Sequence, residues 1–242
     1  MPSSDIKKLH EEVIALGSPQ KAKVSEWFFK TGKGEYAEGD KFIGLTTPES
    51  KMIAKKYSDL LNLEDLTKLL KSEIHEERII SIILLKEKYK KGDEKVKEEI
   101  FNIYIGNTKH INNWDIVDIS AEYIVGDYLE NKEKNLLYDF SKSEILWERR
   151  ISIMSTFGYI KKGKPELTLK LAEILLEDRQ DLINKAVGWM LREIGKRCSQ
   201  ELLEEFLKKH YKKIPRTALR YAIEKFPEPL RQKYLKGDFL GI

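Results

Sequence analysis

The chain contains an internal repeat, so folds built from repeated units fit it best. Residues 77–92 align with residues 148–163 at an offset of 71, and 8 of the 16 aligned positions are identical. Trp114 lies about halfway between the two segments and a further helical pattern begins near Asp181, so the unit is roughly 35 residues long. A unit of this length matches a pair of helices that buries its apolar face against neighbouring pairs.

Helix signals run along nearly the whole sequence. Ser4-Asp5 and Ser18-Pro19 begin the first two helices, the second is expected to end at Gly32, and residues 46–49 resemble a capping box. Later helices are expected at about 64–72, 75–91, 94–105, 113–128, 131–140, 144–161, 165–177, 181–197, 200–211 and 216–226. No strand pattern interrupts them. We therefore predict an all-α protein, an α-solenoid of HEAT-like repeats that forms one domain over residues 1–242.

One long glycine-rich stretch, residues 31–45, separates two of the predicted helices. Gly32, Gly34 and Gly39 do not form a G-x-G-x-x-G pattern, and no Gly-Lys-Ser/Thr follows them, so a phosphate-binding loop is not indicated. We interpret the stretch as a structural connector, with a ligand-facing loop as the alternative.

Positive charge is concentrated in the C-terminal third. The whole chain carries a net charge of +4, whereas residues 185–236 contain 14 Lys and Arg against 6 Glu, a net of +8. A basic surface of this kind suits a polyanion such as DNA, and solvated helix faces are the alternative interpretation.

The sequence also indicates the compartment. No apolar run approaches the roughly 20 residues that a membrane-spanning helix needs, and residues 1–5 are polar and lack a signal-peptide core. Cys198 is the single cysteine, so an intramolecular disulfide is impossible and a reducing compartment is expected. We predict a cytoplasmic protein that does not bind membranes.

The residues around Trp114 form the most distinctive local pattern. Asn112 and Asn113 are suited to cap a helix. Trp114 and Asp118 are four residues apart and therefore share one face of that helix. An aromatic ring beside a carboxylate favours a cationic ligand. Asp115 is interpreted as an acid that stabilises the first helical turn.

The repeat alignment draws attention to Arg150, because its counterpart is the apolar Ile79. A guanidinium at such a position is expected to reach the surface or to meet an anion, since an unpaired buried charge is costly. A clamp on a phosphate is the functional interpretation, and a salt-bridged or surface-reaching arginine is the alternative. Trp147 and Trp189 either pack between repeats or line a cation-binding surface.

Other chemistries fit the sequence poorly. The Glu76-Glu77 and Glu204-Glu205 pairs are interpreted as solvated faces. Neither a nucleotide-binding fingerprint nor metal-ligand spacing is present, so no metal and no cofactor are expected. The histidines are scattered along the chain at positions 10, 75, 110 and 210.

Four segments resemble one known family, the DNA alkylation repair glycosylases of the AlkD type, which are HEAT-like α-solenoids. They are NWDIVD at 113–118, LWERR at 146–150, KAVGWMLRE at 185–193 and FIGLTTPE at 42–49. The third of these is the most specific. Asn113 stands where some members have a second Trp, and the loop at 31–41 is longer than in the shorter members.

The resemblance assigns roles to individual residues. It implies that Trp114, Asp118 and Trp189 are catalytic residues in one concave, basic DNA-binding cleft, and that Arg150 holds the DNA backbone beside the lesion. Further DNA contacts are expected from Trp27, Lys185 and Arg192.

The implied substrate is double-stranded DNA that carries N3- or N7-alkylated purines, such as 7-methylguanine and 3-methyladenine. These bases are cationic and leave readily, so Asp118 has to stabilise positive charge on the deoxyribose and orient a water. The resemblance gives no lysine the role of a Schiff-base nucleophile, which predicts hydrolysis without strand cleavage. The protein is expected to work as a monomer and to be nucleoid-associated when bound. A non-catalytic DNA-binding protein and a protein-interaction scaffold remain the alternatives.

Overall fold

Helices make up almost all of the regular structure. The computed structural model describes residues 3–238, and within that range the sole β-type contact is an isolated bridge between Lys41 and Ile74. The predicted all-α fold of helical repeats is therefore confirmed. Backbone contacts divide the chain into two compact units, Met1–Ser120 and Ala121–Ile242. The single domain over residues 1–242 stays a prediction.

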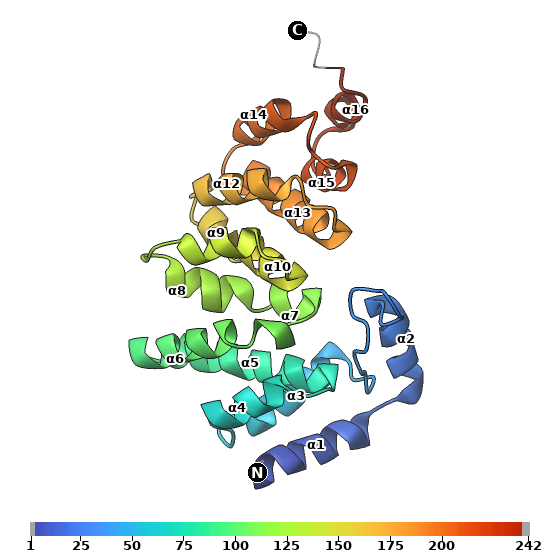
Figure 1. The fold of residues 1–242 in the computed structure, drawn as a ribbon, viewed down its shortest axis with the longest axis vertical. Helices are drawn as coiled ribbons and strands as arrows, with labels where there is room; N and C mark the ends of the chain where they lie inside the picture. The colour runs from blue at the N-terminus through green and yellow to red at the C-terminus, as the bar shows by residue number, and fades with distance from the viewer. Residues whose placement is uncertain (1–2, 239–242) are drawn as a thin grey trace. The chain divides into compact units, whose positions relative to one another are not determined.

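The first unit is organised around its longest helix, α5, which packs against α1, α3, α4, α6 and α7 (Figure 1). Its elements are α1 (Ser4–Leu16), α2 (Pro19–Phe29), α3 (Thr47–Tyr57), α4 (Leu63–Leu70), α5 (His75–Lys91), α6 (Glu94–Ile105), a 3-10 turn η1 (Thr108–His110) and α7 (Trp114–Asp118). Ile80, Leu84 and Leu85 of α5 are buried in the core that these helices share.

The starts of α2 and α3 follow from the capping residues of the sequence. The Ser18 hydroxyl accepts the N–H of Lys21 at the start of α2, and Pro19 occupies the first turn. Thr46 and Glu49 form the predicted capping box of α3, in which the Thr46 N–H donates to Glu49 at 2.6 Å. The predicted end of α2 at Gly32 was wrong, because Lys30 already adopts a left-handed conformation with φ of 59°.

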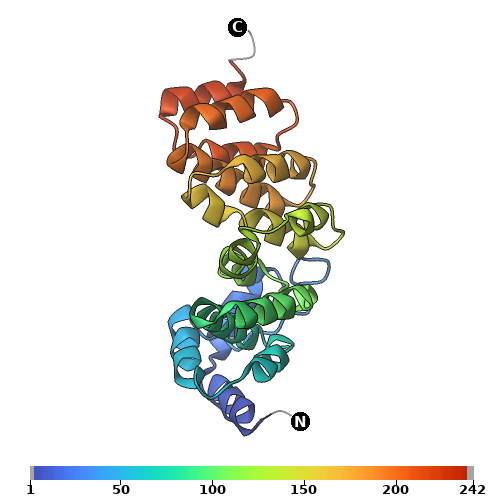
Figure 2. The same ribbon diagram turned by 90° about the vertical axis from the view of Figure 1, so that its left-hand side faces the viewer.

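The second unit is organised around α13, which packs most extensively against α15 and also contacts α10, α11, α12 and α14. Its elements are a π-helical turn η2 (Glu122–Gly126), α8 (Asp127–Leu129), α9 (Asn135–Ser141), α10 (Leu146–Met154), α11 (Phe157–Lys161), α12 (Glu166–Leu175), α13 (Asp181–Arg197), α14 (Gln200–His210), α15 (Arg216–Ala222) and α16 (Glu228–Lys236). In both views the helices of this unit stack side by side in layers (Figure 1, Figure 2).

Two predicted helices are broken by hydroxyl side chains. The helix expected at 113–128 ends at Asp118, and the helix expected at 144–161 ends at Met154. Just after these ends, the Ser120 hydroxyl donates to the carbonyl of Ile116 at 2.6 Å. In the same way, the Ser155 hydroxyl donates to the carbonyl of Ile151 at 2.6 Å. Serine hydroxyls that bond back to the chain compete with helix propagation, so both predictions of a continuous helix were wrong.

Helix α16 was not predicted. It begins after Pro227 and carries Pro229 in its first turn. Proline is tolerated there, because the first helical N–H groups have no partner within the helix. In the sequence the two prolines resemble a helix breaker.

The internal repeat is confirmed, because equivalent residues of its two copies form the same hydrogen bonds. Arg78 donates to the carbonyl of Ser72 at 2.9 Å, and Arg149 donates to the carbonyl of Ser143 at 2.7 Å. Each of these serines also donates from its hydroxyl to a glutamate five residues later. The matching stretch therefore extends in the N-terminal direction beyond residue 77, to the identical KSEI at 71–74 and 142–145.

Gly188, in the KAVGWMLRE segment at 185–193, has a packing role. A Cβ atom at Gly188 would lie 2.5 Å from the carbonyl oxygen of Ala218, so α13 and α15 approach each other more closely than any larger residue permits. None of the helices within residues 3–238 is both long and apolar enough to cross a membrane.

Candidate functional site

Helix α7 is a single turn that carries two of the expected catalytic residues. The side chain of Asn113 is fully buried and accepts the N–H of Trp114 at 2.8 Å, as the predicted cap. Trp114 and Asp118, at the two ends of this turn, are both half-buried. The two residues, which the sequence predicts to share one helical face, therefore lie at the two ends of a single turn.

The Trp114 ring is held in an aromatic cluster. It stacks on Phe29 with ring centroids 5.3 Å apart and an interplanar angle of 25°, and Phe28 approaches it edge-on at 6.0 Å. Phe29 stacks in turn on Phe42 at 5.0 Å. Offset and edge-to-face pairs of this kind fix ring orientations. The cluster thus sets the direction of the indole before any ligand arrives.

The C-terminal end of α7 is anchored beside Asp118. The Tyr104 hydroxyl lies 2.9 Å from the hydroxyl of Ser120, which also bonds to the last turn of α7. Burial raises the pKa of Tyr104, and the negative charge of Asp118 raises it further. The phenol is therefore a neutral, fixed neighbour of the Asp118 carboxylate.

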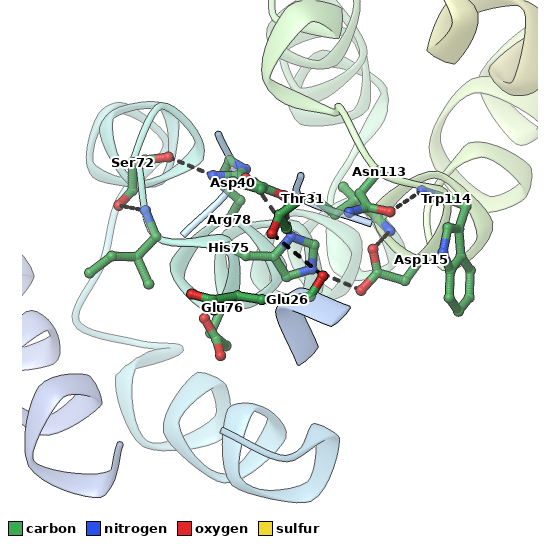
Figure 3. A network of polar contacts seen from close by, with 12 residues as sticks. Glu26, Thr31, Asp40, Ser72, His75, Glu76, Arg78, Asn113, Trp114 and Asp115 are labelled. Carbon is green, nitrogen blue, oxygen red and sulfur yellow. Dashed lines mark hydrogen bonds and ion pairs between the residues drawn. The ribbon is translucent and has the colours of Figure 1, made fainter. Parts of the chain in front are cut away.

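A buried charged network holds the N-terminal end of α7, and the sequence interpretation missed it (Figure 3). His75 is 2% exposed; its Nδ1 lies 3.0 Å from Asp40 Oδ2 and its Nε2 lies 2.9 Å from Asp115 Oδ2. Arg78 pairs with the other oxygen of Asp40. Asp115 therefore does more than stabilise the first helical turn, since it links α7 to α5.

The protonation state of His75 follows from these contacts. Burial alone would lower the pKa of His75, but the carboxylates of Asp115 and Asp40 outweigh burial and raise it from 6.5 to about 9. Conversely, burial would raise the pKa of Asp40, but hydrogen bonding to His75 and the charge of Arg78 hold it below its usual value. At neutral pH the network contains two cations and two carboxylates.

The prediction that Glu76 and Glu77 form a solvated face was wrong, because each is 4% exposed. Glu76 accepts the backbone N–H groups of residues 43, 44 and 45, the closest at 2.7 Å. Glu77 accepts the hydroxyl of Ser72 and lies 2.7 Å from a ring nitrogen of His10. Glu76 therefore holds the end of the glycine-rich stretch against α5, as a structural connector requires, and Glu77 links α5 to Ser72 and to His10 of α1.

A cavity of about 640 Å³ lies beside the network, between α2, α3, α5 and α7. Phe29, Phe42, His75 and Asp115 form part of its wall. Its charged lining also includes four lysines and two glutamates: Lys51, Lys55, Lys86, Lys91, Glu76 and Glu87. The cationic groups outnumber the acidic groups, which suits an anionic ligand group such as a phosphate.

In the second unit, Arg150 is mostly covered. It is 5% exposed, and its Nη1 donates to the carbonyl of Leu182 in α13 at 2.6 Å. From the sequence, the Arg150 guanidinium was expected to reach the surface or to meet an anion; a backbone carbonyl was not expected as its partner. This contact ties α10 to the start of α13, the helix that carries Trp189.

Trp189 is half-buried on α13, and its ring centroid lies 6.0 Å from that of Phe157. Lys185 and Arg192, one turn on either side, have acidic partners: Lys185 pairs with Asp181 at 2.8 Å and Arg192 pairs with Glu224. A DNA phosphate would have to replace these carboxylates.

Two further tryptophans differ in exposure. Trp147 is 6% exposed and belongs to the core, whereas Trp27 on α2 is 73% exposed with the Lys30 ammonium 5.4 Å from its ring centre. The structure thus brings Trp114 and Asp118 together in the first unit and places Arg150 and Trp189 on contacting helices of the second. A single cleft that contains all four stays a prediction.

Comparison with known proteins finds a matching family and similar solved structures. A family model described as "DNA alkylation repair enzyme" matches residues 9–226. Among solved structures, a predicted DNA alkylation repair enzyme from Enterococcus faecalis is similar with a TM-score of 0.68 and 19% sequence identity, over 88% of this chain and 97% of that one. At this identity the structural likeness shows the fold alone. No curated protein matches.

Proposed function

The chain belongs to the family of DNA alkylation repair enzymes, and we propose that within this family it is a monofunctional DNA glycosylase. Its reaction is the hydrolysis of the N-glycosidic bond of cationic alkylated purines, such as 7-methylguanine and 3-methyladenine, in double-stranded DNA. The observation that carries the proposal is α7, which holds Trp114 and Asp118 within one turn that is anchored at both ends.

The chemistry requires little acid catalysis. The bond between C1′ and the base nitrogen breaks with its electron pair moving to the base, whose positive charge is thereby neutralised. Positive charge develops on the deoxyribose, and water then adds at C1′ and loses a proton. A carboxylate fixed beside the sugar stabilises the developing charge and orients the water. We assign both tasks to Asp118.

The aromatic residues are assigned to the cationic nucleotide. Trp114, fixed by Phe29 and Phe28, offers an indole to the lesion, and cation–π attraction favours the charged base over an undamaged one. Trp189 is assigned the same kind of contact from α13. Because the undamaged base is neutral, this attraction contributes to selectivity.

DNA affinity is assigned to cationic groups. Arg150 is assigned to a phosphate, which has to approach a side chain that is 5% exposed and whose direction is fixed by its bond to Leu182. Lys185 and Arg192 exchange their carboxylate partners for phosphates, and exposed Trp27 lies against the duplex. Such binding is sequence-independent and weakens as salt rises. The protein works as a monomer in the cytoplasm and associates with the nucleoid when bound.

The experiment follows the products from a duplex with a single 7-methylguanine. We expect free base and an intact strand with an abasic site, which breaks only after alkali treatment. Borohydride should trap no covalent enzyme–DNA adduct, because no Schiff base forms. Strand cleavage or a trapped adduct would overturn the monofunctional assignment. Tight, salt-sensitive binding without base release would identify a non-catalytic DNA-binding protein, and absence of both would favour a protein scaffold.

A further inference from the structure

We propose that His75 is a positioning residue, which holds α7, and with it Trp114 and Asp118, in place by bridging Asp115 of α7 to Asp40 as a clamp. The inference rests on the proposed function, because it concerns the residues assigned to that reaction. His75 joins Asp40, in the glycine-rich stretch, to Asp115, the second residue of α7 (Figure 3). A side chain that lies outside every family motif in the sequence thus contacts the helix that carries the proposed chemistry.

The repeat shows that the fold itself does not require this histidine. Leu146 occupies the equivalent place in the second copy, 71 residues later. The neighbouring arginine pairs with an aspartate in both copies, Arg78 with Asp40 and Arg149 with Asp178. The second copy of the repeat therefore has the apolar Leu146 at this position and forms no clamp. The buried histidine is specific to the first unit.

The contacts define which form of His75 makes the clamp. Both ring nitrogens face carboxylate oxygens, and a neutral imidazole could donate to only one of them. Arg78 pairs with Asp40 and its Nη2 also lies 3.4 Å from His75 Nδ1, and Glu76 is engaged by backbone N–H groups. The cavity wall beside His75 adds the charged groups of Lys51, Lys55, Lys86, Lys91 and Glu87. The imidazolium form thus matches one donor to each carboxylate.

A single helical turn depends on such external contacts. An isolated turn is unstable because its nucleation cost is not repaid by further hydrogen bonds. Contacts from outside the turn hold α7 in place. The Asn113 cap and the His75 contact to Asp115 hold its N-terminal end, and the Ser120–Tyr104 pair holds its C-terminal end. Removing the clamp leaves the N-terminal end, which carries Trp114, with the Asn113 cap and the ring contacts to Phe29 and Phe28, while the opposite end keeps its anchor.

The test compares His75→Gln and Asp115→Asn with His210→Gln, a matched change at a buried histidine of the second unit. We expect the first two variants to lower the single-turnover rate of 7-methylguanine release at least about tenfold, since small misplacements of reacting groups are costly. Affinity for undamaged duplex should stay within about twofold, because no phosphate contact is lost. The wild-type rate should fall above about pH 9, and that pH dependence should be absent in His75→Gln.

A second readout does not depend on catalysis. The indole N–H resonance of Trp114, assigned with Trp114→Phe, should shift in His75→Gln and stay in place in His210→Gln. If wild type released no base but this resonance shifted, the proposed function would fail and the clamp would stand. An unmoved Trp114 resonance, or an excision rate that His75→Gln leaves intact, would overturn the positioning role.

Discussion

Raising the pH should remove a defined amount of folding free energy through His75. Its pKa is 6.5 in the unfolded chain and about 9 in the folded protein. The folded state therefore binds the proton more tightly. The stabilisation is complete below about pH 6.5 and is lost as the pH rises through about 9. Each pKa unit corresponds to about 1.4 kcal/mol, so the whole effect is about 3 kcal/mol. The side chain is only 3% exposed, so solvent screening does not reduce it.

Urea denaturation followed by circular dichroism measures this effect. Wild type and His75→Gln are compared from about pH 6 to about pH 10 at constant ionic strength, and His210→Gln serves as the control. The difference in unfolding free energy between wild type and His75→Gln should shrink by about 3 kcal/mol over that range. Ionisation of groups that do not interact with His75 cancels in the difference. A difference that stays constant with pH, or grows, would refute the assignment of an imidazolium clamp.

Three further predictions concern other parts of the molecule. Gly188→Ala should lower the unfolding free energy by about 1–3 kcal/mol, because its Cβ would meet the carbonyl of Ala218; thermal denaturation measures this. Glu76→Gln should increase amide exchange at residues 43–45, which lose a charged acceptor, whereas unchanged exchange would contradict the role of Glu76. Trp189→Ala should slow base release about tenfold or more while the affinity for undamaged duplex changes little, as measured by single-turnover kinetics and titration.

Local features of the fold could be predicted from the sequence because they depend on nearby residues. The capping box at Thr46 and the cap at Asn113 use side chains within three positions of the groups they bind. The pairing of Trp114 with Asp118 follows from helical spacing. The two helix breaks were missed because a serine in an apolar periodic stretch gives no sign of which carbonyl it will bond.

The His75 network could not be predicted from spacing, because its partners lie 35 and 40 positions away. The burial of Glu76 has the same origin, since its N–H donors come from a distant stretch. One signal was present in the repeat itself. Extending the alignment to residue 71 places His75 opposite Leu146, and a titratable residue at an apolar repeat position needs an explanation.

The proposed role of Asp118 is tested by comparing wild type with Asp118→Asn under single-turnover conditions. The substrate is duplex DNA with one 7-methylguanine, and both base release and DNA affinity are measured. We expect wild type to release the base, and the variant to release it at least about tenfold more slowly while its affinity for DNA is retained, because the amide cannot stabilise positive charge on the sugar. Release at the wild-type rate by Asp118→Asn would contradict the proposed mechanism, and no release by wild type would contradict the proposed function.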